Sequence, residues 1–243
     1  MVVLHGGYGD GAQAERAYHW DSLADSEHFL VAYPDGVGRA WNAGSCCGRP
    51  AQADIDDVGF LTAMVAAIEQ QAPVDAGRVY VAGMSNGAMM ALRLGCQTNL
   101  FAAVAAVAGT LLTDCSQAAP TSVLQIHGTA DHTVPYDGGP GKAVTRAGSP
   151  RVDGPSAQAV NATWRTVDRC PPPMTSSSGD VTIESADCPD GRTVELITVA
   201  GAGHQWPGGR ANPVAEKIAG VSPPSGALDA TTTIWQFFSQ HHR

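Results

Sequence analysis

The sequence is poor in basic residues and contains no cluster of them. Its 243 residues include 14 Lys and Arg against 23 Asp and Glu, so the formal net charge is −9 and the isoelectric point is about 5.2. Only two of the basic residues are lysines. A protein that binds nucleic acid or an anionic membrane surface needs concentrated positive charge. The charge balance therefore argues against either as the main partner.

Long hydrophobic runs are also missing. No apolar stretch approaches the roughly 20 residues that a membrane-spanning helix requires, so we expect no membrane span. Residues 1–5 have neither the basic region nor the long apolar stretch of a signal peptide. They instead have the composition of a β-strand, and we expect a chain that lacks preceding strands. With 44% hydrophobic residues, the chain can still bury a sizeable core.

The motifs that hold metals and cofactors are absent from the sequence as well. No group of His, Cys, Asp and Glu has the spacing of a catalytic metal site. The Gly-rich segments lack the Lys of a phosphate-binding loop and the Gly-x-Gly-x-x-Gly pattern of a dinucleotide site. We therefore expect neither a metal nor a cofactor.

Six cysteines are present, and their even number without tight metal spacing predicts three disulfides. They are Cys46, Cys47, Cys96, Cys115, Cys170 and Cys188. Disulfides indicate an oxidising compartment, so we expect a secreted or cell-envelope protein. Cys170 and Cys188 flank a Pro-, Ser- and Gly-rich stretch and should pair, whereas adjacent Cys46 and Cys47 should bridge to different partners. The alternative is six reduced thiols in a cytosolic enzyme.

Apolar runs of strand length alternate with helical patterns along the chain. This succession predicts a single α/β domain over residues 1–243, with a mostly parallel central sheet flanked by helices. The expected strands are 2–4, 29–33, 79–82, 102–107, 123–126, 181–184 and 193–199. The expected helices are one capped by Asp56 or Asp57, and 86–96, 156–167 and 230–240. Residues 136–155 should form an irregular excursion and residues 170–178 a loop, within a disulfide-stapled segment over 170–199.

The most informative motif is Gly83-Met84-Ser85-Asn86-Gly87, which lies between an expected strand and an expected helix. In a Gly-x-Ser-x-Gly turn the serine adopts a strained backbone conformation, and side chains at the flanking glycine positions would clash with neighbouring elements. The turn presents the hydroxyl at the carboxyl end of the sheet and directs the helix N-terminus toward the reacting carbonyl. In this context the motif predicts Ser85 as a nucleophile.

A serine nucleophile needs a base, and the base needs an acid that orients it. In this class of fold the chain order is Ser, then Asp or Glu, then His. Asp131 and His204 each follow an expected strand in that order, so we predict the triad Ser85, Asp131 and His204. Asp137 is the nearest rival for the acid. We expect His5 and His127 to be structural hydrogen-bonding groups, and His19, His28, His241 and His242 to lie at the surface.

Two backbone N–H groups should stabilise the oxyanion of the reaction. One is that of Asn86, directly after the nucleophile. The other should come from His5-Gly6-Gly7-Tyr8-Gly9, where Gly7 is the first choice and Tyr8 the second. The simpler interpretation of this segment is a Gly-rich turn that joins a strand to a helix, and one turn can serve both purposes.

Three aromatic residues are candidates for substrate contact, because an aromatic side chain near an active site can stack on a sugar or an aromatic acyl group. They are Trp206, Trp41 and Tyr8. Trp side chains also pack surface loops, which is the structural alternative for both tryptophans.

Several segments together resemble the secreted polyhydroxybutyrate depolymerase and feruloyl or acetylxylan esterase-like family of α/β-hydrolases. They are Leu4-His5-Gly6-Gly7, Trp41-Asn42 with Cys46-Cys47-Gly48, Asp56-Asp57-Val58-Gly59-Phe60, the serine motif through Met90, His127-Gly128-Thr129-Ala130-Asp131 with Val134-Pro135-Tyr136, and Gly203-His204-Gln205-Trp206-Pro207-Gly208. The resemblance implies the same triad, a backbone donor at Gly7, and Trp206 beside the catalytic histidine. It also implies export from the cell and additional N-terminal strands.

The sequence therefore predicts a serine carboxylesterase with an acyl-enzyme mechanism. Its expected partner is an ester substrate, which is polymeric if it is a polyhydroxyalkanoate or an acetyl- or feruloyl-bearing polysaccharide; the resemblance does not choose among these. One alternative is a serine peptidase of the same fold, which the lack of a large substrate-selecting domain disfavours. The other is a catalytically silent binding protein with this fold.

Overall fold

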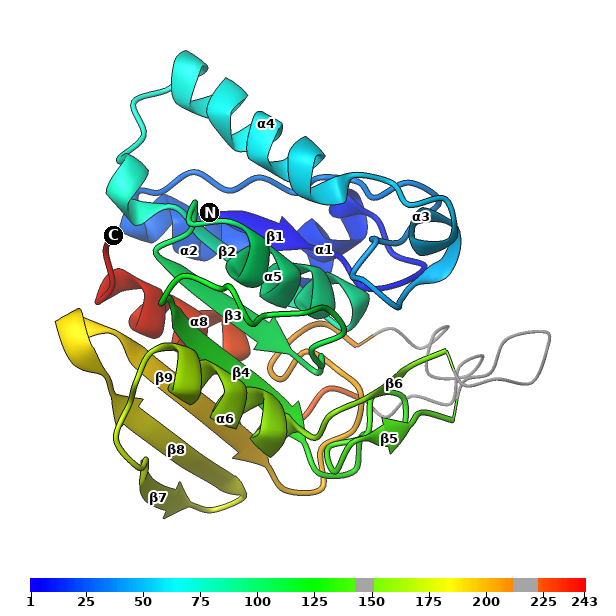
Figure 1. The fold of residues 1–243 in the computed structure, drawn as a ribbon, viewed down its shortest axis with the longest axis vertical. Coiled ribbons are helices and arrows are strands. Elements are labelled where there is room, and N and C mark those ends of the chain that lie inside the picture. Colours follow the sequence, from blue (N-terminus) through cyan, green and yellow to red (C-terminus); the bar gives the residue numbers. More distant parts are fainter. Residues whose placement is uncertain (143–150, 212–222) are drawn as a thin grey trace.

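A mixed β-sheet forms the centre of the molecule (Figure 1). The computed structural model describes residues 1–142, 151–211 and 223–243, and within them the sheet has seven strands. In spatial order these are β1 (Val2–Leu4), β2 (Tyr80–Met84), β3 (Ala103–Val107), β4 (Ser122–Gly128), β9 (Thr193–Val199), β8 (Val181–Asp187) and β7 (Met174–Ser178). Strands β1 to β4 and β9 are parallel, and β8 and β7 continue the sheet in antiparallel pairing.

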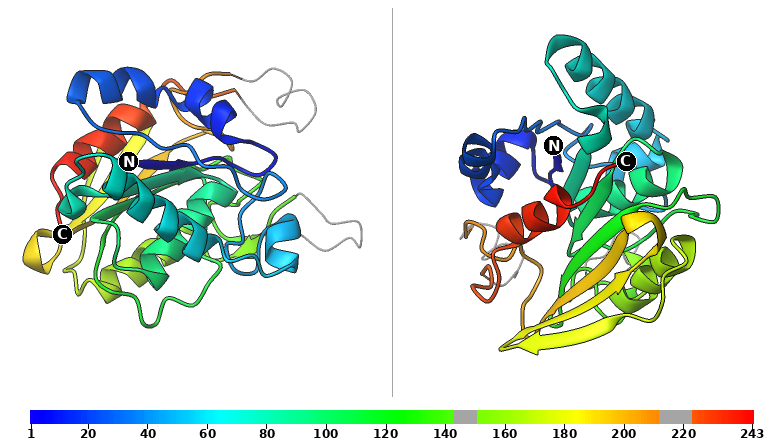
Figure 2. Two further views of the ribbon diagram at one scale, coloured as in Figure 1. Left: turned by 90° about the horizontal axis from the view of Figure 1, so that it is seen from above. Right: turned by 90° about the vertical axis from the view of Figure 1, so that its left-hand side faces the viewer.

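Helices cover both faces of this sheet, as Figure 2 shows. Helices α1, α2 and α8 lie on one face, and α4, α5 and α6 lie on the other. Their bounds are α1 Gly11–Tyr18, α2 Trp20–Glu27, α4 Asp57–Gln71, α5 Asn86–Gln97, α6 Ala157–Val167 and α8 Ala230–Ser239, with a short α3 at Gly48–Gln52. Because the central strands are covered on both sides, every residue of β3 and β4 is buried.

The core divides into two clusters, one on each face of the sheet. Leu61 of α4, Met90 of α5 and Trp164 of α6 pack against one face. Trp20 of α2 and Phe238 of α8 pack against the other. The expected mostly parallel sheet flanked by helices is therefore confirmed.

Side-chain caps fix where several helices begin. Asp10, Asp56, Ser156 and Asp229 each accept a hydrogen bond from a backbone N–H three residues further on. Such a bond satisfies one of the N–H groups that a helix leaves unpaired in its first turn. Of the two acids expected to begin α4, Asp56 is the cap, and Asp57 is the first helical residue.

Two expected elements differ in the structure. Residues 29–33 do not form a strand, because only Ala32 pairs with β1, through a single bridge to Val2. Residues 174–178, expected as loop, form β7 at the sheet edge, where β8 supplies hydrogen-bond partners although all five residues are exposed. Of the expected excursion over 136–155, residues 143–150 lie outside the described residues. The remainder contains the two-residue strands β5 (Gly139–Pro140) and β6 (Asp153–Gly154).

The structure contains three disulfides, and one of them contradicts the expected pairing. Cys170 pairs with Cys188, as predicted, and holds the ends of the segment that contains β7 and β8. Cys96, in α5, pairs with Cys115 in the loop after β3. Cys46 and Cys47 pair with each other, so the prediction that they bridge to different partners was wrong. The reason is that the fold brings Cys96 and Cys115 together, with 4.9 Å between their Cα atoms.

The helices that the structure describes include none that is both long and apolar enough to cross a membrane.

Candidate active site

Ser85 occupies the turn between β2 and α5 with a backbone conformation that few residues adopt. Its φ is 55° and its ψ is −120°, which lies outside the regions that ordinary side chains favour. The flanking glycines permit this turn. A Cβ atom on Gly83 would lie 2.3 Å from the carbonyl oxygen of Gly87, and one on Gly87 would lie 2.4 Å from that of Leu4. Both positions therefore exclude any side chain, as the Gly-x-Ser-x-Gly pattern predicts.

Three side chains from separate loops form a hydrogen-bonded chain at the carboxyl edge of the sheet. His204 Nε2 lies 2.8 Å from Ser85 Oγ, and His204 Nδ1 lies 2.7 Å from Asp131 Oδ2. Ser85 follows β2, Asp131 follows β4 and His204 follows β9. Because these strands are parallel, their carboxyl ends meet at one edge, and the loops after them converge there.

Asp131 is buried and held in place by several donors. Its Oδ1 accepts hydrogen bonds from the backbone N–H groups of Thr133 and Val134. Its Oδ2 faces His204 and also lies 3.4 Å from His127 Nε2. Burial acts to raise the pKa of Asp131, but the bonds from His127 and His204 outweigh burial and hold the pKa well below its usual range. The carboxyl is therefore ionised, and it can only accept the Nδ1–H of His204, which leaves Nε2 to accept the hydroxyl of Ser85.

The competing residues lie elsewhere. Asp137, the rival acid, is exposed and is not part of the hydrogen-bonded chain. The same holds for His132, which directly follows Asp131. His127 is buried and contacts the carbonyl oxygen of Val134 at 2.8 Å, in line with the structural role expected for it. His241, expected at the surface, is buried because its ring packs against that of Phe237, with the centroids 4.4 Å apart. Its Nδ1 lies 2.7 Å from the Phe237 carbonyl oxygen.

His5 has the expected structural role and shapes the loop that follows β1. Burial lowers the pKa of His5, so the ring is neutral at neutral pH. Its Nε2 accepts from the N–H of Gly36 at 3.0 Å, which makes Nδ1 the donor to the carbonyl oxygen of Gly6 at 2.8 Å. This ring therefore ties the loop to the segment that contains Gly36.

The N–H groups in the loop after β1 differ in whether they donate hydrogen bonds within the protein. The N–H of Gly9 donates to Gly6, and the N–H of Tyr8 donates to the carbonyl oxygen of Arg39. Tyr8, the second choice for an oxyanion donor, is thus engaged within the protein. Among the described residues no acceptor engages the Gly7 N–H. A Cβ atom on Gly7 would lie 3.9 Å from Asn86 Cβ, so the two expected donors are neighbours.

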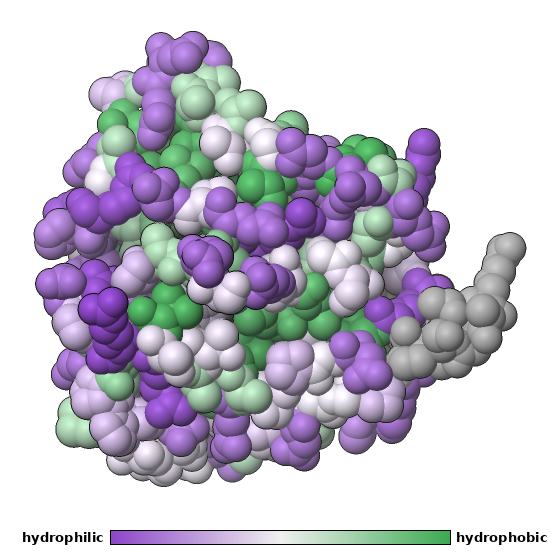
Figure 3. Space-filling view, in the orientation of Figure 1, coloured by the Kyte–Doolittle hydropathy of each residue, from purple (hydrophilic) through white to green (hydrophobic). Residues whose placement is uncertain are grey.

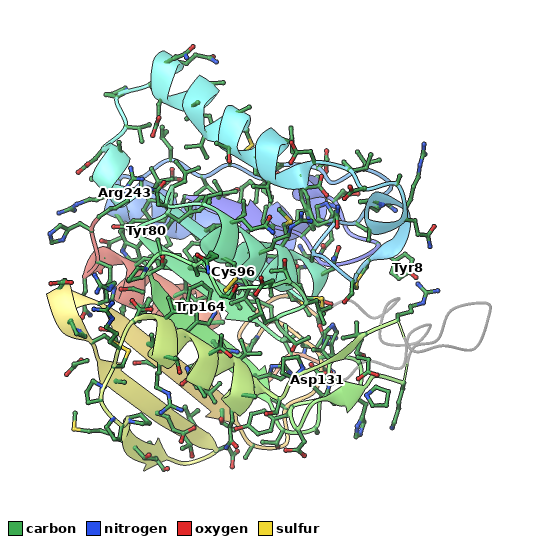
Figure 4. All side chains as sticks on the ribbon, in the orientation of Figure 1. Tyr8, Tyr80, Cys96, Asp131, Trp164 and Arg243 are labelled. Carbon is green, nitrogen blue, oxygen red and sulfur yellow. A yellow bond between two sulfur atoms is a disulfide. The ribbon has the colours of Figure 1, made fainter. Side chains whose placement is uncertain are left out.

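The three aromatic candidates for substrate contact lie in different environments. Trp206 is 2% exposed, stacks on Tyr18 and donates to Thr231 Oγ1. Trp41 is 0% exposed. Both indoles are core residues with satisfied N–H groups, which contradicts the expectation that they present a surface to substrate. Tyr8 is 72% exposed, and Figure 4 shows it at the same end of the molecule as Asp131, opposite Tyr80 and Arg243.

Sequence reasoning missed the residues that hold the segment around Trp41. The Asn86 side chain accepts from the Trp41 N–H at 2.6 Å and donates to the Trp41 carbonyl at 3.0 Å. The buried Asp57 accepts from the Asn42 N–H, and Arg93 donates to the Asn42 carbonyl. Burial raises the pKa of Asp57. The motifs Trp41-Asn42 and Asp56-Asp57 were visible in the sequence, but nothing in it showed that they are hydrogen-bonded to each other.

This arrangement can perform nucleophilic chemistry at a carbonyl group. It provides a hydroxyl, an imidazole that can remove its proton, an ionised acid behind the imidazole, and backbone N–H groups beside the hydroxyl. In the described part of the chain no group of three or more His, Cys, Asp and Glu side chains is placed to hold a metal ion.

Comparison with known proteins finds similar sequences that carry esterase names. The Phospholipase/Carboxylesterase family profile matches residues 51–143. NocK of Nocardia uniformis subsp. tsuyamanensis, which carries an esterase name, is 33% identical over 232 residues, and feruloyl esterase B of Piromyces equi is 31% identical over 221 residues. The alignments cover 86% and 84% of this chain, but 65% and 39% of the two relatives. The chain thus spans less than two thirds of the length of either relative.

A solved structure shares the arrangement of strands and helices. The acetyl xylan esterase from Aspergillus awamori superimposes with a TM-score of 0.64, over 98% of this chain and 88% of that one. At 15% sequence identity, the likeness is one of fold.

Proposed function

We propose that this chain is a serine carboxylesterase with the α/β-hydrolase fold, related to the feruloyl and acetylxylan esterases that it resembles in sequence. The observation that carries the proposal is the continuous hydrogen-bonded chain from Ser85 through His204 to the buried, ionised Asp131. A hydroxyl with such a base and orienting acid is equipped for acyl transfer.

In the proposed first step, Ser85 Oγ attacks the ester carbonyl carbon while its proton moves to His204 Nε2. The carboxylate of Asp131 stabilises the imidazolium that forms. The negative charge on the carbonyl oxygen is stabilised by the N–H groups of Gly7 and Asn86. Collapse of the tetrahedral intermediate breaks the ester bond, and His204 gives its proton to the departing alcohol.

In the second step, water replaces the alcohol. His204 removes a proton from the water molecule, which attacks the acyl-enzyme, and the acid is released as Ser85 Oγ regains its proton. The same two N–H groups serve both intermediates, since both place negative charge on the same oxygen.

The proposed substrates are esters of phenolic or short acids, including those attached to polysaccharides. The relationship to feruloyl esterase B of Piromyces equi supports a phenolic acyl group. The ring of Tyr8 is exposed, and the Arg151 guanidinium lies over one face of it, with Cζ 5.5 Å from the ring centroid. The opposite face offers a surface for stacking of a ferulic ring or a sugar. Three disulfides favour an oxidising compartment, so we propose that the protein acts outside the cytosol, in the secreted or cell-envelope fraction.

The proposal is tested by hydrolysis of p-nitrophenyl acetate and methyl ferulate by the unmutated chain and by Ser85→Ala. We expect kcat to fall by a factor of about 10⁴ or more in the variant, because the nucleophile is lost while folding is kept. Ser176→Ala, an exposed serine on β7, is the matched control and should keep full activity.

Three results would contradict the proposal. Equal rates for the unmutated chain and Ser85→Ala would show that the measured hydrolysis does not use this site. Cleavage of peptides without cleavage of esters would indicate a peptidase. Binding of esters without any turnover would indicate a silent binding protein.

A further inference from the structure

Trp41 contacts both segments that carry the proposed oxyanion donors. Its indole Nε1–H donates to the carbonyl oxygen of His5 at 3.0 Å, in the loop that contains Gly7. Its own N–H and C=O groups are both bonded to the side chain of Asn86, the first residue of α5. One residue thus connects the loop after β1 with the start of α5.

These contacts lie in a fully buried part of the molecule. Trp41 and His5 are 0% exposed and Asn86 is 2% exposed. The rings of His5 and Trp41 also pack with their centroids 4.9 Å apart. A buried hydrogen bond between such groups is costly to break, since no water replaces the missing partner. The relative position of the two segments is therefore tightly determined.

The segment that carries Trp41 is itself held by its surroundings. The Trp41 carbonyl accepts a second hydrogen bond, from the N–H of Cys47, and the N–H of Ala43 donates to the carbonyl of Cys46. Asp57 and Arg93 bond to the backbone of Asn42. Trp41 is thus anchored on one side by the loop that contains the Cys46–Cys47 disulfide and on the other by α4 and α5.

We propose that Trp41 is a positioning residue that sets the distance and orientation of the Gly7 N–H relative to the Asn86 N–H. It does not touch the substrate. Two donors stabilise an oxyanion only when both lie within about 3 Å of one oxygen position, so small displacements reduce transition-state stabilisation. This inference rests on the proposed esterase function and assigns Trp41 a role in place of substrate contact.

The test compares Trp41→Phe with the matched variant Trp164→Phe, in α6. Both replace a fully buried indole of the same core cluster by a smaller ring. Only Trp41→Phe also removes a hydrogen bond, the one from the indole to His5, because the indole N–H of Trp164 has no partner among the described residues. Trp41→Phe leaves the backbone bonds between Trp41 and Asn86 in place. The measurements are kcat and KM for p-nitrophenyl acetate, the thermal midpoint, and the dissociation constant of a phenylboronic acid that forms a tetrahedral adduct at Ser85.

We expect Trp41→Phe to lower kcat by about 10-fold to 100-fold with KM within about twofold, and to weaken boronate binding by a similar factor. Trp164→Phe should also lower the thermal midpoint but keep kcat and boronate affinity within about twofold. A loss of kcat and boronate affinity in Trp41→Phe alone distinguishes positioning from general destabilisation.

Two results would overturn the role of Trp41. One is a loss of kcat that is equal in the two variants and follows their thermal midpoints. The other is unchanged boronate affinity in Trp41→Phe. A failure of the esterase function itself looks different, because the unmutated chain would then show no hydrolysis that depends on Ser85. Boronate binding can still be measured in that case: affinity that depends on Trp41 would support the geometric role, and no binding by the unmutated chain would refute it.

Discussion

At the scale of single residues, the turn at Ser85 requires that its two flanking glycines have no Cβ atom. The serine has a positive φ, and the glycines on either side approach backbone carbonyls too closely for any Cβ atom. Gly83 and Gly87 are therefore required for different contacts, one within the turn and one against β1 and the residue that follows it. The spacing of small residues in the motif follows from these two approaches.

The contact at Gly87 gives a sharp prediction for stability. Replacing a glycine inside a helix by alanine usually stabilises a protein, by up to about 1 kcal/mol. For Gly87→Ala we expect the opposite, a loss of about 1–3 kcal/mol or more, because the new methyl group would lie 2.4 Å from the Leu4 carbonyl oxygen and 2.5 Å from that of His5. Urea unfolding followed by circular dichroism measures the change.

The control for this variant is Gly226→Ala, an exposed site where a Cβ atom would meet nothing within 4 Å. It should leave the unfolding free energy within about 0.5 kcal/mol of the unmutated value. Equal unfolding free energies for the two variants would show that the backbone at Gly87 moves freely.

Asp131 links the candidate site to the pH dependence of stability. Its pKa is lower in the folded protein than in the unfolded chain, where it is about 4. The folded state therefore binds the proton less tightly, so the carboxylate stabilises the fold above about pH 4 and this contribution is lost as the pH falls. In Asp131→Asn the unfolding free energy should change less steeply between about pH 5 and pH 2. Urea titrations at several pH values measure this slope, and an unchanged slope would contradict the assignment.

At the scale of elements, the disulfides differ in what they close. Cys170 and Cys188 are 18 residues apart and span an edge hairpin, whereas Cys46 and Cys47 are adjacent. A cross-link stabilises a fold mainly by restricting the unfolded chain, and more so for a longer loop. The two bonds should therefore contribute very differently to stability, although each is a single covalent link.

Paired substitutions test this difference. Replacing Cys170 and Cys188 by serine should lower the unfolding free energy by about 3 kcal/mol, and replacing Cys46 and Cys47 by serine should lower it by well under half of that. Denaturant unfolding measures both. As a control, alkylation of the unmutated chain without reductant should modify no cysteine, and after reduction it should modify all six. Equal losses in the two double variants would contradict the loop-length argument.

Local sequence patterns identified some elements better than others. The alternation over β8 and β9 and the capped start of α4 were readable because each follows from neighbouring residues. The exposed strand β7 was not, because its five residues carry no buried face and join the sheet only through β8. Residues 29–33 show the converse, since their apolar composition predicts a strand that lacks partners beyond Ala32.

At the scale of the whole molecule, the sheet brings the site together. Its parallel strands end at one edge, so residues 85, 131 and 204 meet although they are far apart in the chain. The face seen in Figure 3 mixes hydrophilic and hydrophobic residues, and the net charge of −9 adds a general repulsion of anions. The uncharged esters proposed above as substrates experience less of this repulsion than a polyanion would.

The sequence by itself determined the features that depend on neighbouring residues and on strand order. These include the α/β architecture, the Gly-x-Ser-x-Gly turn, the structural roles of His5 and His127, and the selection of Ser85, Asp131 and His204 as the residues to examine. The catalytic roles of these three residues stay a prediction, which their hydrogen-bonding geometry supports.

Only the tertiary structure decided which cysteines pair and which aromatic side chains are buried. The pairing of Cys96 with Cys115 and the burial of Trp41 and Trp206 depend on contacts between segments that are distant in the chain. The bonds of Trp41 to His5 and Asn86 arise in the same way. Periodicity and local spacing carry no information on such contacts, because they follow from how the helices and loops pack on the completed sheet.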